Sequence, residues 1–170
     1  AESLPDGGFH LIVAIADVAA YVRPQSALDR EARRRGNSTY FPDRVVPMLP
    51  ERISNDLCSL REGEDRPALA CHMVFDSKGK KLSHRFTRAV MRSAAKLAYE
   101  EAQAAIDGRG GAKANALLDG ALKPLWAAYA TLSSARDRRG PLELDLPERK
   151  IILDKAGNID RVIVPERLDA

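Results

Sequence analysis

Apolar positions along the chain follow strand-like patterns in several places. Residues 10–18 (HLIVAIADV) are almost continuously apolar and follow a turn sequence, which predicts a buried central strand. Residues 67–75 and 81–91 flank the polar turn SKGK, and this arrangement predicts an antiparallel hairpin. A second hairpin is predicted from residues 150–153 and 161–164, which flank the turn DKAGN.

Helical periods predict the remaining regular elements. Ser26 is suited to cap a short helix that ends at Gly36. Residues 93–107 are rich in strong helix formers, and residues 112–139 carry apolar residues at three- and four-residue steps. Pro124 predicts a kink or a restart within the last of these regions.

The order of elements is strand, helix, long loop, hairpin, helices, hairpin, with another alternating strand at 142–146 before the last hairpin. This order predicts an α+β fold in which helices flank a mixed, largely antiparallel sheet. At 170 residues the chain has the usual length of one domain, and we expect residues 1–170 to form a single domain.

The segment 37–60 fits none of these patterns. It combines several prolines and many apolar residues with two adjacent aromatic residues, Tyr40 and Phe41. A long loop of this kind is functional or disordered, and this one is too apolar to remain in water. We therefore expect an ordered loop that packs on a core and presents its aromatic side chains.

Composition and charge add only weak constraints. The net charge is +3 and the sequence pI is about 9.0, which slightly favours a polyanionic partner. Cys58 and Cys71 lie among apolar residues without metal-ligand spacing, so we interpret them as reduced, buried thiols of a cytoplasmic protein. No apolar run approaches the roughly 18 residues of a membrane span, and we expect no membrane partner.

Several polar residues have two possible roles. Asp17, at the end of the first strand, is either a ligand or catalytic group or a cap for the next turn. His72 and His84 are predicted on the two strands of one hairpin, where packing or solvent contact is favoured over metal binding. The arginines of the first helix form either a solvated face or a contact to phosphates through its last turn: Arg30, Arg33, Arg34 and Arg35.

The sequence contains no phosphate-cradling glycine motif, no nucleophile elbow, no zinc-binding helix pair and no tight acidic cluster. What remains is a set of residues typical of nucleic-acid binding. Arg35 lies at a helix end, and Tyr40 and Tyr99 supply aromatic rings that stack on bases without regard to sequence.

Four segments carry a resemblance to a known family: HLIVAIADVAAYV, LDREARRRGNSTYFP, VVPMLPERISNDLCSL and RPALACHMVFDSKG. They resemble the RNB catalytic domain of the RNase II and RNase R family of exoribonucleases, closest to its RNase R branch. The resemblance extends to SAAKLAYEEAQ, RDRRGPLELDLPERK and RVIVPERLDA, and so covers practically the whole chain.

This resemblance implies a processive hydrolase that degrades single-stranded RNA from its 3′ end to nucleoside 5′-monophosphates. It implies Mg²⁺ in the full-length enzyme, which stabilises the attacking and leaving oxygens, and flanking RNA-binding domains as partners. By the same resemblance, Tyr40 stacks near the 3′-terminal nucleotide and Tyr99 contributes to RNA binding. Leu144 stands where close relatives have a base-clamping phenylalanine, which puts the clamp in doubt because leucine cannot stack.

The resemblance also implies that the chain is an internal piece of the domain, truncated at both ends. The aspartate cluster that binds magnesium is expected upstream, and the later catalytic glutamate and arginine downstream. We therefore expect no metal site and no activity in the isolated chain. Two alternatives stay open, namely a non-catalytic RNA-binding module derived from the same family and a scaffold with a purely structural loop.

Overall fold

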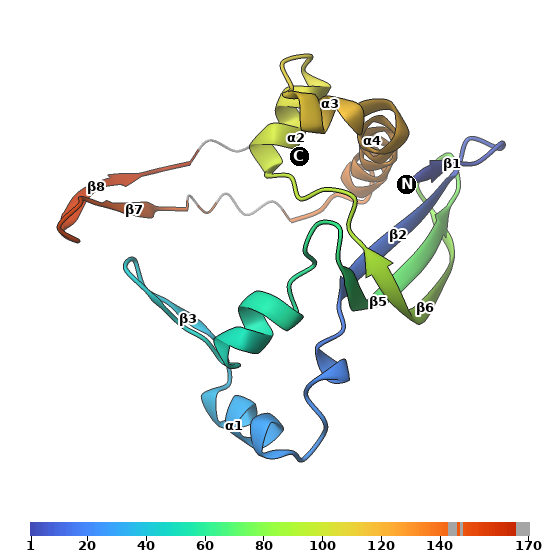
Figure 1. Ribbon diagram of the computed structural model, residues 1–170. Coiled ribbons are helices and arrows are strands. Elements are labelled where there is room, and N and C mark those ends of the chain that lie inside the picture. Colours follow the sequence, from blue (N-terminus) through green and yellow to red (C-terminus); the bar gives the residue numbers. More distant parts are fainter. Residues whose placement is uncertain (143–145, 147, 166–170) are drawn as a thin grey trace. The chain divides into compact units, whose positions relative to one another are not determined.

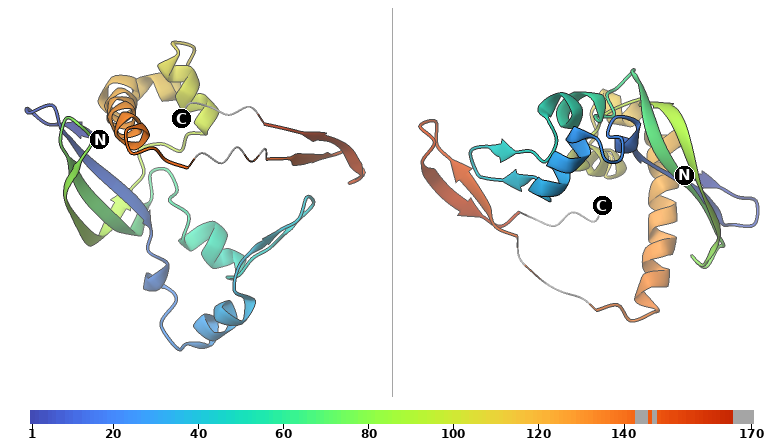
Figure 2. Two further views of the ribbon diagram at one scale, coloured as in Figure 1. Left: turned by 180° about the vertical axis from the view of Figure 1, so that it is seen from behind. Right: turned by 90° about the horizontal axis from the view of Figure 1, so that it is seen from below.

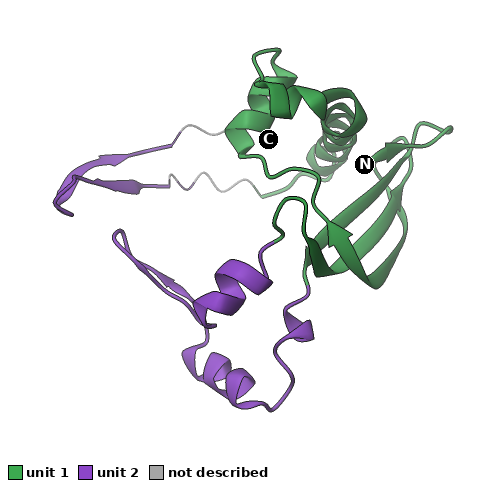
Figure 3. Ribbon diagram, in the orientation of Figure 1, with its two compact units in different colours: residues 1–16, 60–143, 168–170 green, residues 17–59, 144–167 purple. Residues whose placement is uncertain are grey.

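The computed structural model describes residues 1–142, 146 and 148–165. The chain divides into two compact units, which are described separately (Figure 3). The described residues of unit 1 are 1–16 and 60–142, and those of unit 2 are 17–59, 146 and 148–165. The expectation of a single domain over residues 1–170 stays a prediction.

Unit 1 contains an antiparallel sheet of strand order β1-β2-β5-β6 (Figure 1). Its strands are β1 (Glu2–Ser3), β2 (Phe9–Ala16), β5 (Asp65–Phe75) and β6 (Lys81–Arg92). The long hairpin β5–β6 confirms the pairing predicted from alternation around the SKGK turn. Helices accompany the antiparallel sheets in the described residues, which confirms the predicted α+β fold class.

Strand β2 lies between β1 and β5, as expected for a central strand, but it is not buried along its whole length. Phe9 and Leu11 are buried and pack with Ala128 of helix α4 (Lys123–Asp137). Val13 and Ile15, on the same face, are 52% and 60% exposed. The prediction of full burial was wrong because unit 1 covers only the first half of this face.

The helices of unit 1 are α2 (Tyr99–Ile106), α3 (Ala112–Ala116), the π-helical turn η3 (Leu118–Leu122) and α4. Pro124 is the second residue of α4, which confirms the predicted restart. The predicted helix from Ser93 onward begins only at Tyr99. The reason is local, since the Glu101 carboxylate accepts the Ala98 N–H (2.7 Å) and caps the helix there.

The first part of unit 2 contains the predicted short helix, α1 (Ala27–Arg35). The Ser26 hydroxyl accepts the Asp29 N–H (3.1 Å), and the Asp29 carboxylate accepts the Gln25 N–H (2.8 Å). At the other end Gly36 has a φ of 77° and donates its N–H to the Ala32 carbonyl. Both predicted ends are confirmed, and both have their physical cause in these caps.

The loop that follows α1 forms regular elements, as predicted, but the prediction that its apolar residues pack on a core was largely wrong, since Val45 and Val46 are exposed. It forms a small hairpin of β3 (Thr39–Tyr40) and β4 (Val45–Val46), and then the π-helical turn η2 (Arg52–Leu57). A 3₁₀ turn, η1 (Val18–Ala20), precedes α1. Leu49 is the buried apolar residue between the hairpin and η2.

The last elements are β7 (Lys150–Leu153) and β8 (Ile159–Ile163), which confirm the second predicted hairpin (Figure 2). The Asp154 carboxylate closes its turn by accepting the N–H groups of Ala156 (2.8 Å) and Asn158 (2.9 Å). The predicted strand at 142–146 lies largely outside the described residues. No helix within the described residues is both long enough and apolar enough to span a bilayer.

Candidate functional site

The hairpin β3–β4 of unit 2 presents Tyr40 to solvent. Tyr40 pairs with Val45 in the ladder, and its side chain is 77% exposed. Val45 and Val46 are 47% and 44% exposed, so the tyrosine ring is not covered by its own hairpin. An exposed ring fixed on a short strand is able to stack on a planar ligand at a small cost in conformational entropy.

Phe41 and Arg44 form the end of this hairpin. The Phe41 N–H donates to the Arg44 carbonyl (2.8 Å), and the Arg44 guanidinium carbon lies 5.2 Å from the centre of the Phe41 ring. Arg44 also donates to the Asp43 carboxylate (3.0 Å). This cation–π contact places the positive charge of Arg44 over the Phe41 ring, in the loop that follows Tyr40.

The arginines of α1 are largely paired within their own helix. The Glu31 carboxylate accepts hydrogen bonds from Arg34 and Arg35 (2.9 Å each), and these bonds lower the pKa of Glu31 to about 2. Arg33 donates to Asp29 (3.3 Å). Much of the positive charge of this helix is thus compensated by its own acids, which supports the interpretation as a solvated face for most of it.

Arg35 also makes a hydrogen bond outside its own helix, which the sequence did not predict. Its guanidinium donates to the Pro47 carbonyl (3.0 Å) and joins the end of α1 to the residue after β4. The Ser38 hydroxyl accepts the Met48 N–H (2.9 Å) across the same loop. These two bonds fix both ends of the β3–β4 hairpin, so Arg35 orients the segment that carries Tyr40.

Tyr99 is the first residue of α2 in unit 1, and it is 76% exposed. Its neighbours Glu100 and Glu101 lie in the same first turn. Glu101 is engaged with the Ala98 N–H, whereas Glu100 is exposed. The ring is therefore accessible for stacking, although the acidic neighbours disfavour a phosphate close to it.

Asp17 is buried, with 8% exposure, and lies at the N-terminus of η1. Burial raises the pKa of the Cys58 thiol, and the Asp17 charge raises it further. A thiol with a raised pKa is a poor nucleophile, and Cys58 and Cys71 are both free and half-buried. These findings confirm both cysteines as unpaired thiols, but the prediction that they are buried was wrong, since each is only half-buried.

His72 and His84 of the unit 1 sheet make ring contacts, which agrees with the packing role favoured for them. His72 stacks on His10, with ring centres 5.4 Å apart, and His84 contacts the Phe86 ring edge-on at 5.8 Å. Burial lowers the pKa of His72, with further contributions from Arg85 and His10. Within the described part of the chain, no three His, Cys, Asp or Glu side chains form a group that could hold a metal ion.

The predicted site residues are divided between the two units. Arg35 and Tyr40 lie in unit 2, where Arg35 supports the hairpin that carries the tyrosine, and Tyr99 lies in unit 1. Leu144 is outside the described residues. Sequence reasoning missed Arg44, although a basic residue three positions after Phe41 in a proline-containing turn is a usable signal for a cation–π contact.

Comparison with known proteins identifies the family. The family model described as RNB domain matches residues 1–170. The chain is 45% identical over 170 residues to ribonuclease R of Vibrio parahaemolyticus, and 43% identical to that of Escherichia coli. Each alignment covers 99% of this chain, but only 20% and 21% of those proteins, so the chain spans about a fifth of their length.

A solved structure shows the same fold. Mycoplasma genitalium RNase R in complex with ribose-methylated single-stranded RNA matches with a TM-score of 0.90 and 30% identity. The match covers 98% of this chain and 26% of that one. The sequence match over all 170 residues and the structural match agree, and the chain belongs to the RNB domain family, with the ribonuclease R exoribonucleases among its relatives.

Proposed function

We propose that the chain is the central part of the catalytic domain of an exoribonuclease that hydrolyses RNA processively from the 3′ end to nucleoside 5′-monophosphates. Membership of the RNB domain family supports the reaction class. The RNA-bound structure of a relative with the same fold supports RNA as the substrate. Because the chain spans about a fifth of its curated relatives, this activity is proposed for a longer protein that contains it.

The observation that carries the proposal for this part of the domain is the exposure of Tyr40. A tyrosine that is 77% exposed on an ordered hairpin is available to stack on the 3′-terminal base of a single strand. The contact between Arg44 and Phe41 adds a cation–π interaction within the loop that follows Tyr40. Stacking positions the terminal nucleotide and leaves its sequence unread, which suits an enzyme that must degrade any RNA.

The other predicted residues take supporting roles in this proposal. Tyr99 offers a second stacking surface for an upstream base. Arg35 orients the Tyr40 hairpin through the Pro47 carbonyl, and its remaining donors meet a backbone phosphate. A contact of Leu144 with a base stays a prediction.

Magnesium is part of the proposed reaction. The described residues contain no group of three potential ligands, so they do not fit a magnesium site, and we assign no metal-dependent step to them. We propose that flanking parts of the longer protein bind the ion. In this proposal the flanking parts bind the metal ion, and the residues of this chain bind and orient the RNA.

The proposal is tested with the longer protein and a 5′-labelled single-stranded RNA in the presence of magnesium. We expect stepwise shortening from the 3′ end, weaker RNA binding in Tyr40→Ala, and near-normal behaviour in Tyr40→Phe, which keeps the ring. RNA binding without shortening would instead support the non-catalytic binding module. Unchanged affinity and product length in both Tyr40→Ala and Tyr99→Ala would support the scaffold with a structural loop.

The same assay with the isolated 170-residue chain separates RNA binding from catalysis. We expect this chain to leave the RNA intact in magnesium. Degradation by the purified chain would show that the residues that bind magnesium lie within it, which would contradict the proposal that flanking parts bind the ion.

A further inference from the structure

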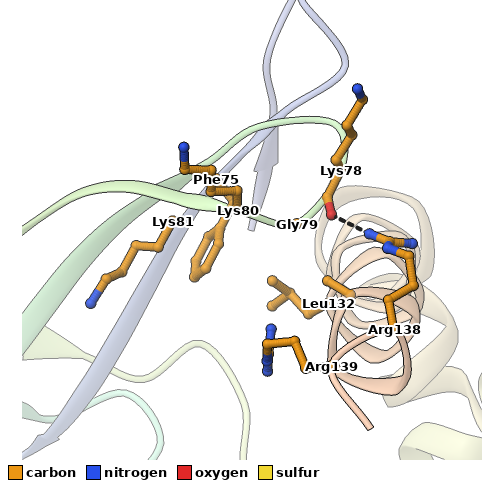
Figure 4. A pocket seen from close by; sticks show the side chains of 9 residues that line it. Phe75, Lys78, Gly79, Lys80, Lys81, Leu132, Arg138 and Arg139 are labelled. Carbon is orange, nitrogen blue, oxygen red and sulfur yellow. Dashed lines mark hydrogen bonds between the residues drawn. The ribbon is translucent and has the colours of Figure 1, made fainter.

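Unit 1 has a basic groove where the turn between β5 and β6 meets the last turns of α4 (Figure 4). The groove has two adjoining hollows of about 560 Å³ and about 510 Å³. Lys78 and Arg138 line both hollows and therefore stand between them. Arg35, Tyr40 and Tyr99 are not among the described residues that line this groove.

Backbone contacts fix the shape of the groove. The Arg138 guanidinium donates to the Lys78 carbonyl (2.6 Å), as Figure 4 shows, and so joins the turn to the helix. Gly79 has a φ of 77°, and a Cβ added to it would lie 2.7 Å from the Ala135 Cβ. Only glycine permits this close approach at that backbone angle, so the turn and the helix are in direct contact.

The described charged residues that line the groove are all cationic. Its exposed cationic side chains come from both elements: Lys78, Lys80, Lys81, Arg138 and Arg139. The described residues that line the two hollows include no aspartate or glutamate. The neighbouring acid Asp76 is directed into the turn, where it accepts the N–H groups of Lys78 and Lys80 (2.9 Å each).

The hydrogen bonds that Asp76 accepts lower the pKa of its carboxyl, with the bond from Lys80 the largest cause. Asp76 therefore stays ionised and stabilises the turn that presents the lysines. Its charge is partly offset by these backbone donors. The lysine side chains themselves remain exposed to solvent.

The two hollows differ in the uncharged residues that line them. Phe75, Leu132 and Ala135 line the first hollow, and Ser77, Thr131 and Ser134 line the second. A ribose or a base face fits an apolar lining, and hydroxyl groups and cations bind phosphate oxygens. This combination matches a sugar–phosphate chain better than a compact inorganic anion.

A simpler explanation covers only part of the cluster. Arginines at the C-terminus of a helix interact favourably with its dipole, which accounts for Arg138 and Arg139. It does not account for Lys78, Lys80 and Lys81, which come from the β5–β6 turn and lie on another element. Concentrating these cations costs mutual repulsion, which a polyanion relieves.

We propose that this basic groove binds the backbone of single-stranded RNA without regard to base sequence, as a contact separate from the Tyr40 hairpin. The inference rests on the proposed function in that RNA is taken as the substrate. Its cations neutralise phosphates of a segment of the strand other than the 3′-terminal nucleotide.

The test compares two double variants of the 170-residue chain by fluorescence anisotropy with a short labelled oligouridylate at several salt concentrations. Lys80→Gln/Arg139→Gln removes two groove cations and leaves the Arg138–Lys78 bond in place. Each lost phosphate contact makes the slope of log affinity against log salt concentration less steep by about 0.7. The loss of two contacts should weaken binding roughly tenfold to fiftyfold at low salt. Thermal unfolding of each variant checks that it is folded, and Lys81→Gln provides a milder second variant.

The matched control is Arg109→Gln/Lys123→Gln. These side chains are 74% and 61% exposed in unit 1, lie outside the groove, and carry the same total charge. We expect the control to bind with nearly wild-type affinity and salt slope. Equal losses of RNA affinity in the two double variants would show an effect of net charge alone and would contradict RNA binding at the groove.

The remaining outcomes separate the groove from the proposed function. If the groove variant keeps wild-type affinity and salt slope, the groove does not bind RNA. The proposed function is still supported in that case, provided that the wild-type chain binds RNA. A loss restricted to an RNA duplex used as a second probe overturns the single-strand assignment. If the wild-type chain binds no RNA, the groove and the RNA-binding role of this chain fail together.

Discussion

Two hairpins of this chain differ in how they are stabilised. The β5–β6 hairpin of unit 1 pairs strands of 11 and 12 residues within a four-stranded sheet, and helix α4 packs on part of that sheet. The β3–β4 hairpin of unit 2 has strands of two residues each and exposes its tyrosine. It depends on side-chain bonds from Arg35 and Ser38 rather than on a core of its own.

The difference indicates that the β3–β4 hairpin is suited to ligand binding and the β5–β6 hairpin to stabilising the fold. A two-residue ladder is too short to be stable alone, so its conformation depends on its surroundings. Its exposed ring contributes little to stability and is available for a ligand. The long hairpin instead forms part of the scaffold, and only its turn contributes to the proposed RNA-binding groove.

The largest expected effect tests the scaffold. Leu11→Ala removes a buried side chain beneath α4 and should destabilise unit 1 by about 2 to 5 kcal/mol, because a cavity remains. Val13→Ala, two residues along the same strand and 52% exposed, should cost less than about 1 kcal/mol. Urea unfolding of both variants measures the difference, and equal losses would mean that α4 does not define the core.

The next effect concerns the turn of the long hairpin. Gly79→Ala should cost roughly 1 to 3 kcal/mol from the left-handed backbone, and more from the contact with Ala135. Gly63→Ala is the matched control, since Gly63 has a similar φ of 75° but nothing within 4 Å of an added Cβ. Denaturant unfolding should show the larger loss for Gly79→Ala, and a larger loss at Gly63 would contradict the close packing of the turn.

A smaller effect is expected from α1 and depends on pH. The folded-state pKa of Glu31 lies at about 2, below its ordinary value of 4.5, so its stabilising contribution is fully present above pH 4.5 and disappears as pH falls to about 2. Glu31→Gln should therefore lower the thermal midpoint slightly at neutral pH, and the difference should vanish near pH 2. Added salt should reduce it, because the ion pairs are exposed.

Much of the fold was predictable because its signals are local. The capping residues Ser26 and Gly36 defined α1, and alternation around SKGK defined the long hairpin. The delayed start of α2 depended on Glu101 capturing one backbone N–H, a choice that helix propensity does not encode. The exposure of Val13 and Ile15 was also unpredictable, since an apolar strand does not show which part of its face will be covered.

The candidate site was predictable in its residues but not in its arrangement. Tyr40 and Tyr99 were identified by type and by family resemblance, and both are exposed. The structural task of Arg35 was invisible because its partner is a backbone carbonyl 12 residues away. The basic groove joins residues about 60 positions apart through the bond from Arg138 to Lys78, so no local pattern indicated it.

The affinity of Tyr40→Ala for a labelled single-stranded RNA, measured together with its thermal midpoint, tests the RNA-binding role of Tyr40 most directly. Loss of one stacking contact should weaken binding by about 1 to 3 kcal/mol and leave the midpoint nearly unchanged, because the ring is 77% exposed. Tyr129→Ala, which removes a tyrosine that is 44% exposed on α4, is the matched control and should bind normally. Wild-type affinity in Tyr40→Ala, or a loss explained by unfolding, would contradict the assignment of this hairpin to RNA.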